Sequence, residues 1–158
     1  MADRASAIIV LHRHILLIHR IRAGEEYYSF PGGSIEKDES AEEACIREVQ
    51  EETSLQTAWL KPAFDFVSPG RTARFFFVAV QPGLVSLGGP EIRKQSEENR
   101  YILEWLPLVE ISRYPLKPEV VRDALAALLV KNGPIREAAD LAAYRDELQE
   151  LLRKSGPG

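Results

Sequence analysis

Acidic residues recur at helical spacing between residues 40 and 55, and this pattern is the clearest sign of chemistry in the chain. On a helix with about 3.6 residues per turn, Glu48, Glu51 and Glu52 fall on one flank. Like charges at this spacing each destabilise a helix by roughly 0.2–0.5 kcal/mol, so we expect a cation between them. Carboxylates without cysteine or paired histidine ligands suit Mg²⁺ or Mn²⁺. The pattern therefore predicts a divalent metal site, with a solvated acidic helix face as the alternative.

The residues before the acidic cluster indicate how it is held. Gly32 and Gly33 follow a proline, a turn signal in which the missing Cβ atoms allow close approach of the backbone. Ser40 and Glu43 match a capping box, so the helix should begin at about Ala41. An arginine in the middle of this helix lies four residues from an acidic residue on each side and can hold the cluster in place.

The stretch from residue 32 to residue 55 resembles the Nudix hydrolase signature, G-x5-E-x7-R-E-U-x-E-E-x-G-U, in which U is an aliphatic residue. The matching positions, in order, are Gly33, Glu39, Arg47, Glu48, Val49, Glu51, Glu52 and Leu55. Ser54 stands where the signature has its last glycine. A glycine there normally ends the helix in the left-handed conformation, which costs a serine on the order of 1 kcal/mol.

This resemblance implies a fold and a reaction. The fold is α/β (α+β), a mixed β-sheet sandwiched between α-helices over residues 1–131, and residues 132–158 form a C-terminal helical extension and tail. The implied reaction is metal-dependent hydrolysis of a nucleoside diphosphate linked to another group. We expect a nucleoside triphosphate as the substrate, with oxidised purine nucleotides as one candidate, giving a nucleoside monophosphate and pyrophosphate. ADP-ribose or another nucleotide sugar is the alternative substrate, and a non-catalytic nucleotide-sensing module is the alternative function.

The resemblance also assigns roles to residues of the signature. Glu48, Glu51 and Glu52 would bind the metal together with the backbone carbonyl of Gly32. Arg47 would orient these carboxylates. The proton acceptor stays open between the last two signature glutamates and a further glutamate outside the signature.

Many Nudix enzymes carry that further glutamate in the loop before the strand that here contains Trp105. Glu98 is our first choice for an additional catalytic residue in this loop. The other acidic candidates in the region are Glu91, Glu97 and Glu104.

Substrate contacts are expected from the strands before the signature. Arg20 and Arg22 alternate on a predicted strand and share a face, which can offer positive charge to a phosphate chain. An aromatic ring at Tyr27 or Tyr28 can stack on a nucleobase, worth roughly 1–3 kcal/mol. The set of candidate substrate-binding residues is Arg20, Arg22, Tyr28, Gly33 and Glu39.

Composition limits the other possibilities. A chain of 158 residues can bury roughly 68–70% of its unfolded surface and needs no disulfide. The single cysteine, Cys45, shares an apolar helix flank with Ile46 and Val49, so we expect a core residue in a cytoplasmic protein. The net charge of −4 argues against stable nucleic-acid binding, and no segment resembles a membrane span. A small-molecule nucleotide is the expected partner.

The remaining segments predict the elements around the signature. Apolar runs at residues 5–11 and 15–21 predict a hairpin, and further strands are expected at 57–67, 71–80 and 101–106. Residues 81–99 read as a long loop, because glycine, proline and charged residues dominate them. Helical periodicity at 118–131 and 135–154 predicts two helices, the second of which would complete the core or form a homodimer surface.

Overall fold

The computed structural model describes residues 2–81, 91–96 and 99–155. In chain order, its elements are β1 Arg4–Leu11, β2 His14–Arg22, β3 Glu25–Ser29, β4 Gly32–Ser34, α1 Ala41–Thr53, β5 Thr57–Ser68, β6 Arg71–Val80, β7 Glu91–Ser96, β8 Asn99–Pro107, the 3₁₀ helix η1 Leu108–Arg113, β9 Leu116–Lys117, α2 Glu119–Asn132, α3 Ala138–Ala142 and α4 Arg145–Ser155. The predicted hairpin, signature helix and first C-terminal helix are all confirmed.

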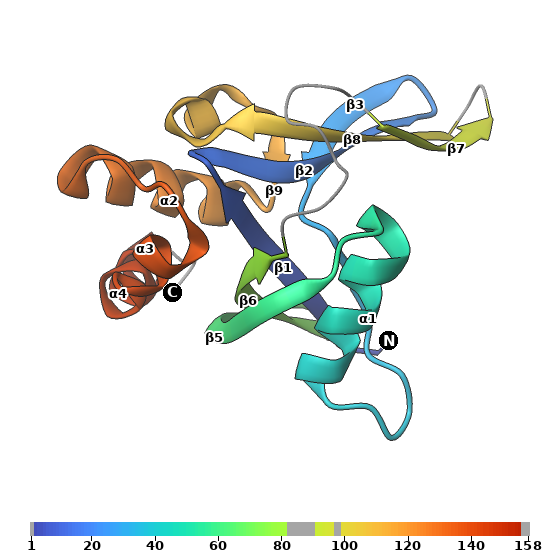
Figure 1. The fold of residues 1–158 in the computed structure, drawn as a ribbon, viewed down its shortest axis with the longest axis horizontal. Coiled ribbons are helices and arrows are strands. Elements are labelled where there is room, and N and C mark those ends of the chain that lie inside the picture. Colours follow the sequence, from blue (N-terminus) through green and yellow to red (C-terminus); the bar gives the residue numbers. More distant parts are fainter. Residues whose placement is uncertain (1, 82–90, 97–98, 156–158) are drawn as a thin grey trace.

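The strands belong to one mixed sheet that opens into two halves. Its main path is β5-β6-β1-β2-β3-β9, with parallel pairing between β1 and β6 and between β3 and β9. β1 and β2 pair only beside their turn, at Val10–Ile15 and Leu11–His14. Beyond the turn they diverge, so that β4, β1, β6 and β5 form one half of the sheet, and β2, β3, β8, β7 and β9 form the other (Figure 1).

Side chains alternate along the strands and build two cores. In β1, Ile8 and Val10 point into one core, whereas Ala5, Ala7 and Ile9 point into the other. Helices α2, α3 and α4 contribute to the first core, and α1 contributes to the second. Figure 1 shows α1 on one side of the sheet and the other three helices together on the opposite side. The predicted sheet sandwiched between helices is therefore confirmed.

Two predicted elements are wrong in part. The expected loop at 81–99 contains β7, Glu91–Ser96, which pairs antiparallel with β8. The expected helix at 135–154 is broken into α3 and α4, and this break lets buried side chains from both pieces reach the same core. Sequence periodicity did not predict either feature, because both depend on long-range contacts. The strand β7 pairs with β8, and α4 packs on α2.

The C-terminal extension packs against the rest of the chain. Leu141 and Leu148 are fully buried in the core that also contains residues of α2 and the sheet. Asn132 donates a hydrogen bond from Nδ2 to Oε2 of Glu147, 2.6 Å away, which joins α2 to α4. These contacts favour the core role that was one of the two expectations for this segment. Among the described helices, none is long and apolar enough to cross a membrane.

Candidate active site

Both ends of α1 are fixed by local hydrogen bonds. The Ser40 hydroxyl accepts from the Glu43 backbone N–H at 3.0 Å, and Oε1 of Glu43 accepts from the Ser40 backbone N–H at 2.9 Å. This capping box starts the helix at Ala41, as predicted. At the other end, Ser54 adopts the left-handed conformation with φ of 63°, and its N–H bonds to the carbonyl of Gln50. The serine thus keeps the helix ending that glycine normally provides.

The two glycines of β4 allow close approaches on two sides, to β1 at Gly32 and to α1 at Gly33. A Cβ on Gly32 would lie 2.2 Å from the carbonyl oxygen of Ala5 on the neighbouring strand. A Cβ on Gly33 would lie 2.4 Å from Cδ of Glu48, inside the space that this carboxylate occupies. The Gly32 backbone N–H donates to Oε1 of Glu52 at 2.6 Å. Gly32 therefore lets β4 lie close to β1 and holds Glu52 through its N–H, and Gly33 makes room for the Glu48 carboxylate.

Arg47 forms hydrogen bonds with three glutamates, of which Glu51 was an expected partner, whereas the other expected partner, Glu43, caps the start of α1. Arg47 donates two hydrogen bonds to Glu39, from Nε at 2.7 Å and from Nη2 at 3.0 Å. Its Nη1 reaches Oε1 of Glu48 at 2.8 Å and Oε2 of Glu51 at 3.3 Å, and its Nη2 also binds the carbonyl of Ser34. The hydrogen bonds from Arg47, supported by a backbone N–H, lower the pKa of Glu39 to about 2. Glu39 is therefore a fixed anion that locks the arginine in place.

Glu52 is the buried carboxylate of the site. Burial is the main cause that raises its pKa to about 7, and the nearby charge of Glu48 raises it further. The Gly32 N–H and the charges of Arg20 and Arg4 act in the opposite direction. Nη2 of Arg20 lies 4.0 Å from Oε2 of Glu52, and no other ion pair to Glu52 is found among the described residues. Such a carboxylate would gain from a cation bound beside it.

The three signature carboxylates do not converge as one cluster, which corrects the sequence-based expectation. Within the described residues, no three acidic, histidine or cysteine side chains lie close enough together to enclose a metal ion. Glu48 and Glu52 are one helical turn apart and contact β4, whereas Glu51 is 58% exposed and shares Nη1 of Arg47 with Glu48. Two carboxylates beside a strand fit Mg²⁺, which usually takes one or two protein carboxylates and completes its octahedron with water and phosphate.

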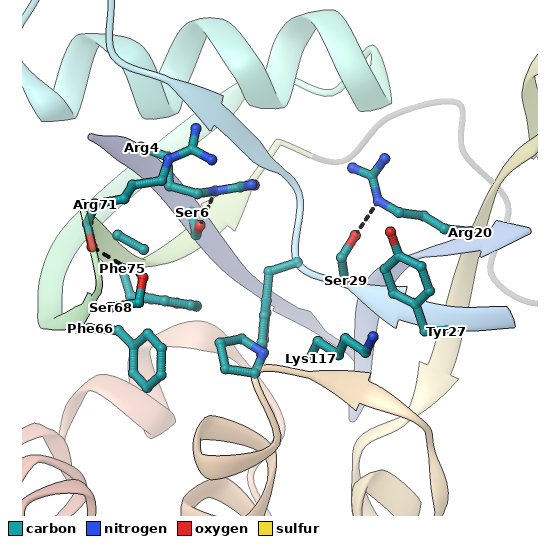
Figure 2. Close-up of a pocket in the computed structure, with 13 residues that line it drawn as sticks. Arg4, Ser6, Arg20, Tyr27, Ser29, Phe66, Ser68, Arg71, Phe75 and Lys117 are labelled. Atoms are coloured by element: carbon teal, nitrogen blue, oxygen red, sulfur yellow. Dashed lines mark hydrogen bonds between the residues drawn. The ribbon is translucent and has the colours of Figure 1, made fainter. Parts of the chain in front are cut away.

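A pocket of about 500 Å³ lies beside this face, lined by residues from both halves of the sheet. Arg20 lines it, with Nε donating to the Ser29 hydroxyl at 2.7 Å (Figure 2). Arg22, two residues further along β2, is exposed and is not among the lining residues. The shared strand face predicted for the two arginines therefore brings only the first of them to the pocket.

Tyr27, rather than Tyr28, faces the pocket. Tyr27 pairs with Arg20 across β2 and β3, so both side chains lie on the same face of the sheet. Tyr28 stacks on His19 with ring centroids 4.6 Å apart and donates a hydrogen bond to Glu104 at 3.4 Å. The structure thus places Tyr28 with a different cluster of side chains from the one around the pocket.

The acidic candidates outside the signature are only partly located. Glu97 and Glu98 lie outside the described residues, and Glu91 is the first residue of β7. Oε2 of Glu104 lies 2.8 Å from Nδ1 of His19, and Glu104 does not line the pocket. A role for Glu98 in catalysis therefore stays a prediction.

Three basic residues of the pocket were missed by the sequence reasoning. Arg4 and Arg71 are the first residues of β1 and β6, and Lys117 is the last residue of β9. The parallel pairing of β1 with β6 brings the two arginines into the same pocket. Nothing in the spacing of these residues signals that pairing, because the strands are separated by the whole signature segment.

Comparison with solved structures shows that other proteins share this fold. The MutT protein from Bacillus halodurans is 22% identical, with a TM-score of 0.58 and 82% of each chain covered. The E. coli ORF135 protein is 25% identical, with a TM-score of 0.57, covering 83% of this chain and 92% of that one. A protein described as an ADP compounds hydrolase is 17% identical, with a TM-score of 0.54, covering 98% of this chain and 74% of that one. No curated protein sequence gave a significant match.

The family comparison covers most of the chain. A family model described as the NUDIX domain matches residues 1–128, which include the signature helix, β4 and every strand around the pocket. The arrangement of a capped acidic helix against a glycine strand agrees with this match. The chain therefore belongs to the Nudix family and is a Nudix hydrolase.

Proposed function

We propose that this chain hydrolyses a nucleoside triphosphate to a nucleoside monophosphate and pyrophosphate, with Mg²⁺ or Mn²⁺ as cofactor. The observation that carries the proposal is the basic pocket next to the acidic helix. Arg4, Arg20, Arg71 and Lys117 line it, and no acidic residue lines it among the described residues. A triphosphate brings several negative charges, and arginine is well suited to bind phosphate oxygens.

The same pocket offers surfaces for a nucleobase. Tyr27 and Phe66 line it and are half-buried, whereas Phe30 and Phe75, which also line it, are only 2% exposed and belong to the core. The ammonium group of Lys117 lies 4.6 Å from the centre of the Tyr27 ring (Figure 2). Aromatic rings can stack on any base, which gives affinity without selecting one base strongly. The mixture of charged and aromatic lining therefore fits a nucleotide better than a purely inorganic anion.

The carboxylates of α1 would hold the metal beside this pocket. Glu48 and Glu52 face β4 and would be the ligands, together with the carbonyl of Gly32. A bound divalent metal would supply charge neutralisation and a lower pKa for a water molecule. Arg47 would keep the Glu48 carboxylate in place through the hydrogen bond at 2.8 Å. The proton acceptor would be Glu51 or Glu52 within the signature, or Glu98 outside it.

A substrate panel tests this proposal. Purified protein would be incubated with nucleoside triphosphates, oxidised purine nucleotides, nucleotide sugars and dinucleoside polyphosphates in Mg²⁺, with phosphate release coupled in parallel to pyrophosphatase and to phosphatase. Pyrophosphatase-dependent phosphate from triphosphates is the expected result. Signal through phosphatase alone would instead identify ADP-ribose or a related compound as the substrate. Nucleotide binding without turnover of any compound would point to a sensing module and contradict the proposal.

A further inference from the structure

Three guanidinium groups gather in the pocket beside the acidic helix. We call Arg4, Arg20 and Arg71 the arginine cradle. Figure 2 shows the side chains of Arg4 and Arg71 close together on one side of the pocket and that of Arg20 on the other side, with α1 running above them. Their charges face one shared space, although they come from three different strands.

Each member of the cradle is held through its Nε by a neutral oxygen. Arg4 donates to the Ser6 hydroxyl at 3.2 Å, and Arg20 donates to the Ser29 hydroxyl at 2.7 Å. Ser6 is 3% exposed, so its hydroxyl is a fixed acceptor inside the protein. These bonds orient the two guanidinium groups but leave their positive charge unneutralised.

Arg71 is held in the same way from the edge of β6. Its Nε donates to the backbone carbonyl of Ala2 at 3.0 Å, and its Nη2 donates to the Ser34 hydroxyl at 3.0 Å. The carbonyl of Ser34 accepts from Nη2 of Arg47 at the same distance. One residue of β4 therefore contacts both the cradle and the arginine that organises the signature carboxylates.

The cradle is short of negative charge. Among the described residues, neither Arg4 nor Arg71 forms an ion pair with a carboxylate, and Arg20 reaches Glu52 only at 4.0 Å. Burial lowers the pKa of Arg4, and the charges of Arg71 and Arg20 lower it further, so the guanidinium groups repel one another, whereas the charges of Glu52 and Glu48 act in the opposite direction. A fold that holds three mutually repelling guanidinium groups in fixed positions gains stability when an anion binds between them.

We infer that Arg4, Arg20 and Arg71 bind the phosphates of the substrate that lie beyond the metal-bound one, and that they select substrates by the number of phosphates. Ser6 and Ser29 act as positioning residues that aim two of the guanidinium groups. This inference takes its substrate class from the proposed function. It adds the expectation that a triphosphate is preferred over a diphosphate of the same base because of the cradle.

The preference for a triphosphate over a diphosphate, measured as a ratio of kcat/KM values, tests the role of the arginine cradle. For wild type, Arg4→Met and Arg71→Met, kcat/KM would be measured with a nucleoside triphosphate and with the diphosphate of the same base. Each substitution should lower the ratio of these two values by about ten- to a hundredfold, the effect of one charge-assisted hydrogen bond to phosphate. Arg113→Met is the matched control, because Arg113 is 77% exposed on η1 and does not line the pocket. An unchanged ratio in Arg4→Met and Arg71→Met would overturn the inference.

The positioning residues are tested by separating KM from kcat. Ser6→Ala and Ser29→Ala should raise KM for the triphosphate with little change in kcat, since both arginines remain but lose their orienting hydrogen bonds. Ser29→Thr keeps a hydroxyl and should restore KM. A general loss of folding would instead lower kcat for the triphosphate and the diphosphate alike. An unchanged KM in both alanine variants would contradict the positioning role.

A binding experiment separates the inference from the proposed function. In EDTA, calorimetry would compare orthophosphate, pyrophosphate and tripolyphosphate as ligands of the wild-type protein. Affinity should increase along this series, and the increase should be lost in Arg4→Met and Arg71→Met but kept in Arg113→Met. If this result is found while no triphosphate is hydrolysed, the phosphate-binding role of the arginine cradle is supported and the proposed function is contradicted. If triphosphates are hydrolysed but affinity does not follow the series, the proposed function is supported and the phosphate-binding role of the arginine cradle is contradicted.

Discussion

Replacing Gly33 with alanine should impair the acidic site while leaving the fold intact. An alanine Cβ would lie 2.4 Å from Cδ of Glu48 and 2.5 and 2.7 Å from its carboxylate oxygens. Ordinary contact begins at 3.4 Å, so the Glu48 carboxylate must retreat by about 1 Å. A displacement of this size at a reacting centre can lower the rate about a hundredfold. We therefore expect kcat/KM to fall by about two orders of magnitude.

The same substitution should have a small effect on stability. The atom in the way is the end of a flexible side chain, so the cost in unfolding free energy should lie at the low end for overpacking, about 1 kcal/mol. Gly133→Ala is the matched control, because a Cβ there meets no atom within 4 Å while the backbone has φ of +79°. It should cost about 1–2 kcal/mol of stability and leave kcat/KM unchanged.

The two variants are compared by urea unfolding and by steady-state kinetics of pyrophosphate release. Gly33→Ala is expected to lose activity with only a small loss of stability, and Gly133→Ala is expected to keep activity while losing at least as much stability. Retention of wild-type kcat/KM in Gly33→Ala would refute the reasoning that the missing Cβ makes room for Glu48.

Three further predictions concern the signature helix. Arg47→Lys cannot make the paired hydrogen bonds to Glu39 and should lower kcat/KM at least tenfold by steady-state assay, an effect of about 1.4 kcal/mol, whereas an activity within twofold would contradict the orienting role. Ser54→Gly relieves a left-handed serine and should raise the unfolding free energy by about 0.5–1 kcal/mol in urea titrations, whereas a loss would show that the serine side chain matters more than its backbone strain. Burial raises the pKa of Glu52 from 4.5 to about 7, so the native metal-free protein holds a proton that the unfolded chain releases, and this contribution to stability is lost as the pH rises through about 7. In EDTA, Glu52→Gln should therefore gain stability relative to wild type between about pH 5 and pH 8, by up to about 3 kcal/mol, and a pH-independent difference would contradict this.

Local sequence signals were sufficient for the elements with local causes. The hairpin, the start of α1 at its capping box and the burial of Cys45 all depend on residues close together in the chain, and all are confirmed. The buried flank of α1 was wrong at one position, since Ile46 is 42% exposed. This residue is next to the buried Cys45, and periodicity cannot tell how wide a stripe the sheet will cover.

The lining of the pocket depends on strand pairings between distant parts of the chain, which cannot be predicted from a single sequence. Alternation places Tyr27 and Tyr28 on opposite faces of β3, but only the pairing with β2 decides which of them joins Arg20. Arg4 and Arg71 reach the pocket through parallel pairing of β1 with β6, which no local signal predicts. The residues that would bind substrate are therefore harder to predict than the signature residues, which can be recognised from their spacing in the sequence.

The most direct test of the central claim is pyrophosphate release from a nucleoside triphosphate by wild type and Glu48→Gln, each in Mg²⁺ and in EDTA. Metal-dependent hydrolysis beside β4 predicts release by the wild type in Mg²⁺, none in EDTA, and a loss of at least about tenfold in Glu48→Gln with unchanged folding. Equal release in Mg²⁺ and EDTA, or full activity in Glu48→Gln, would contradict it.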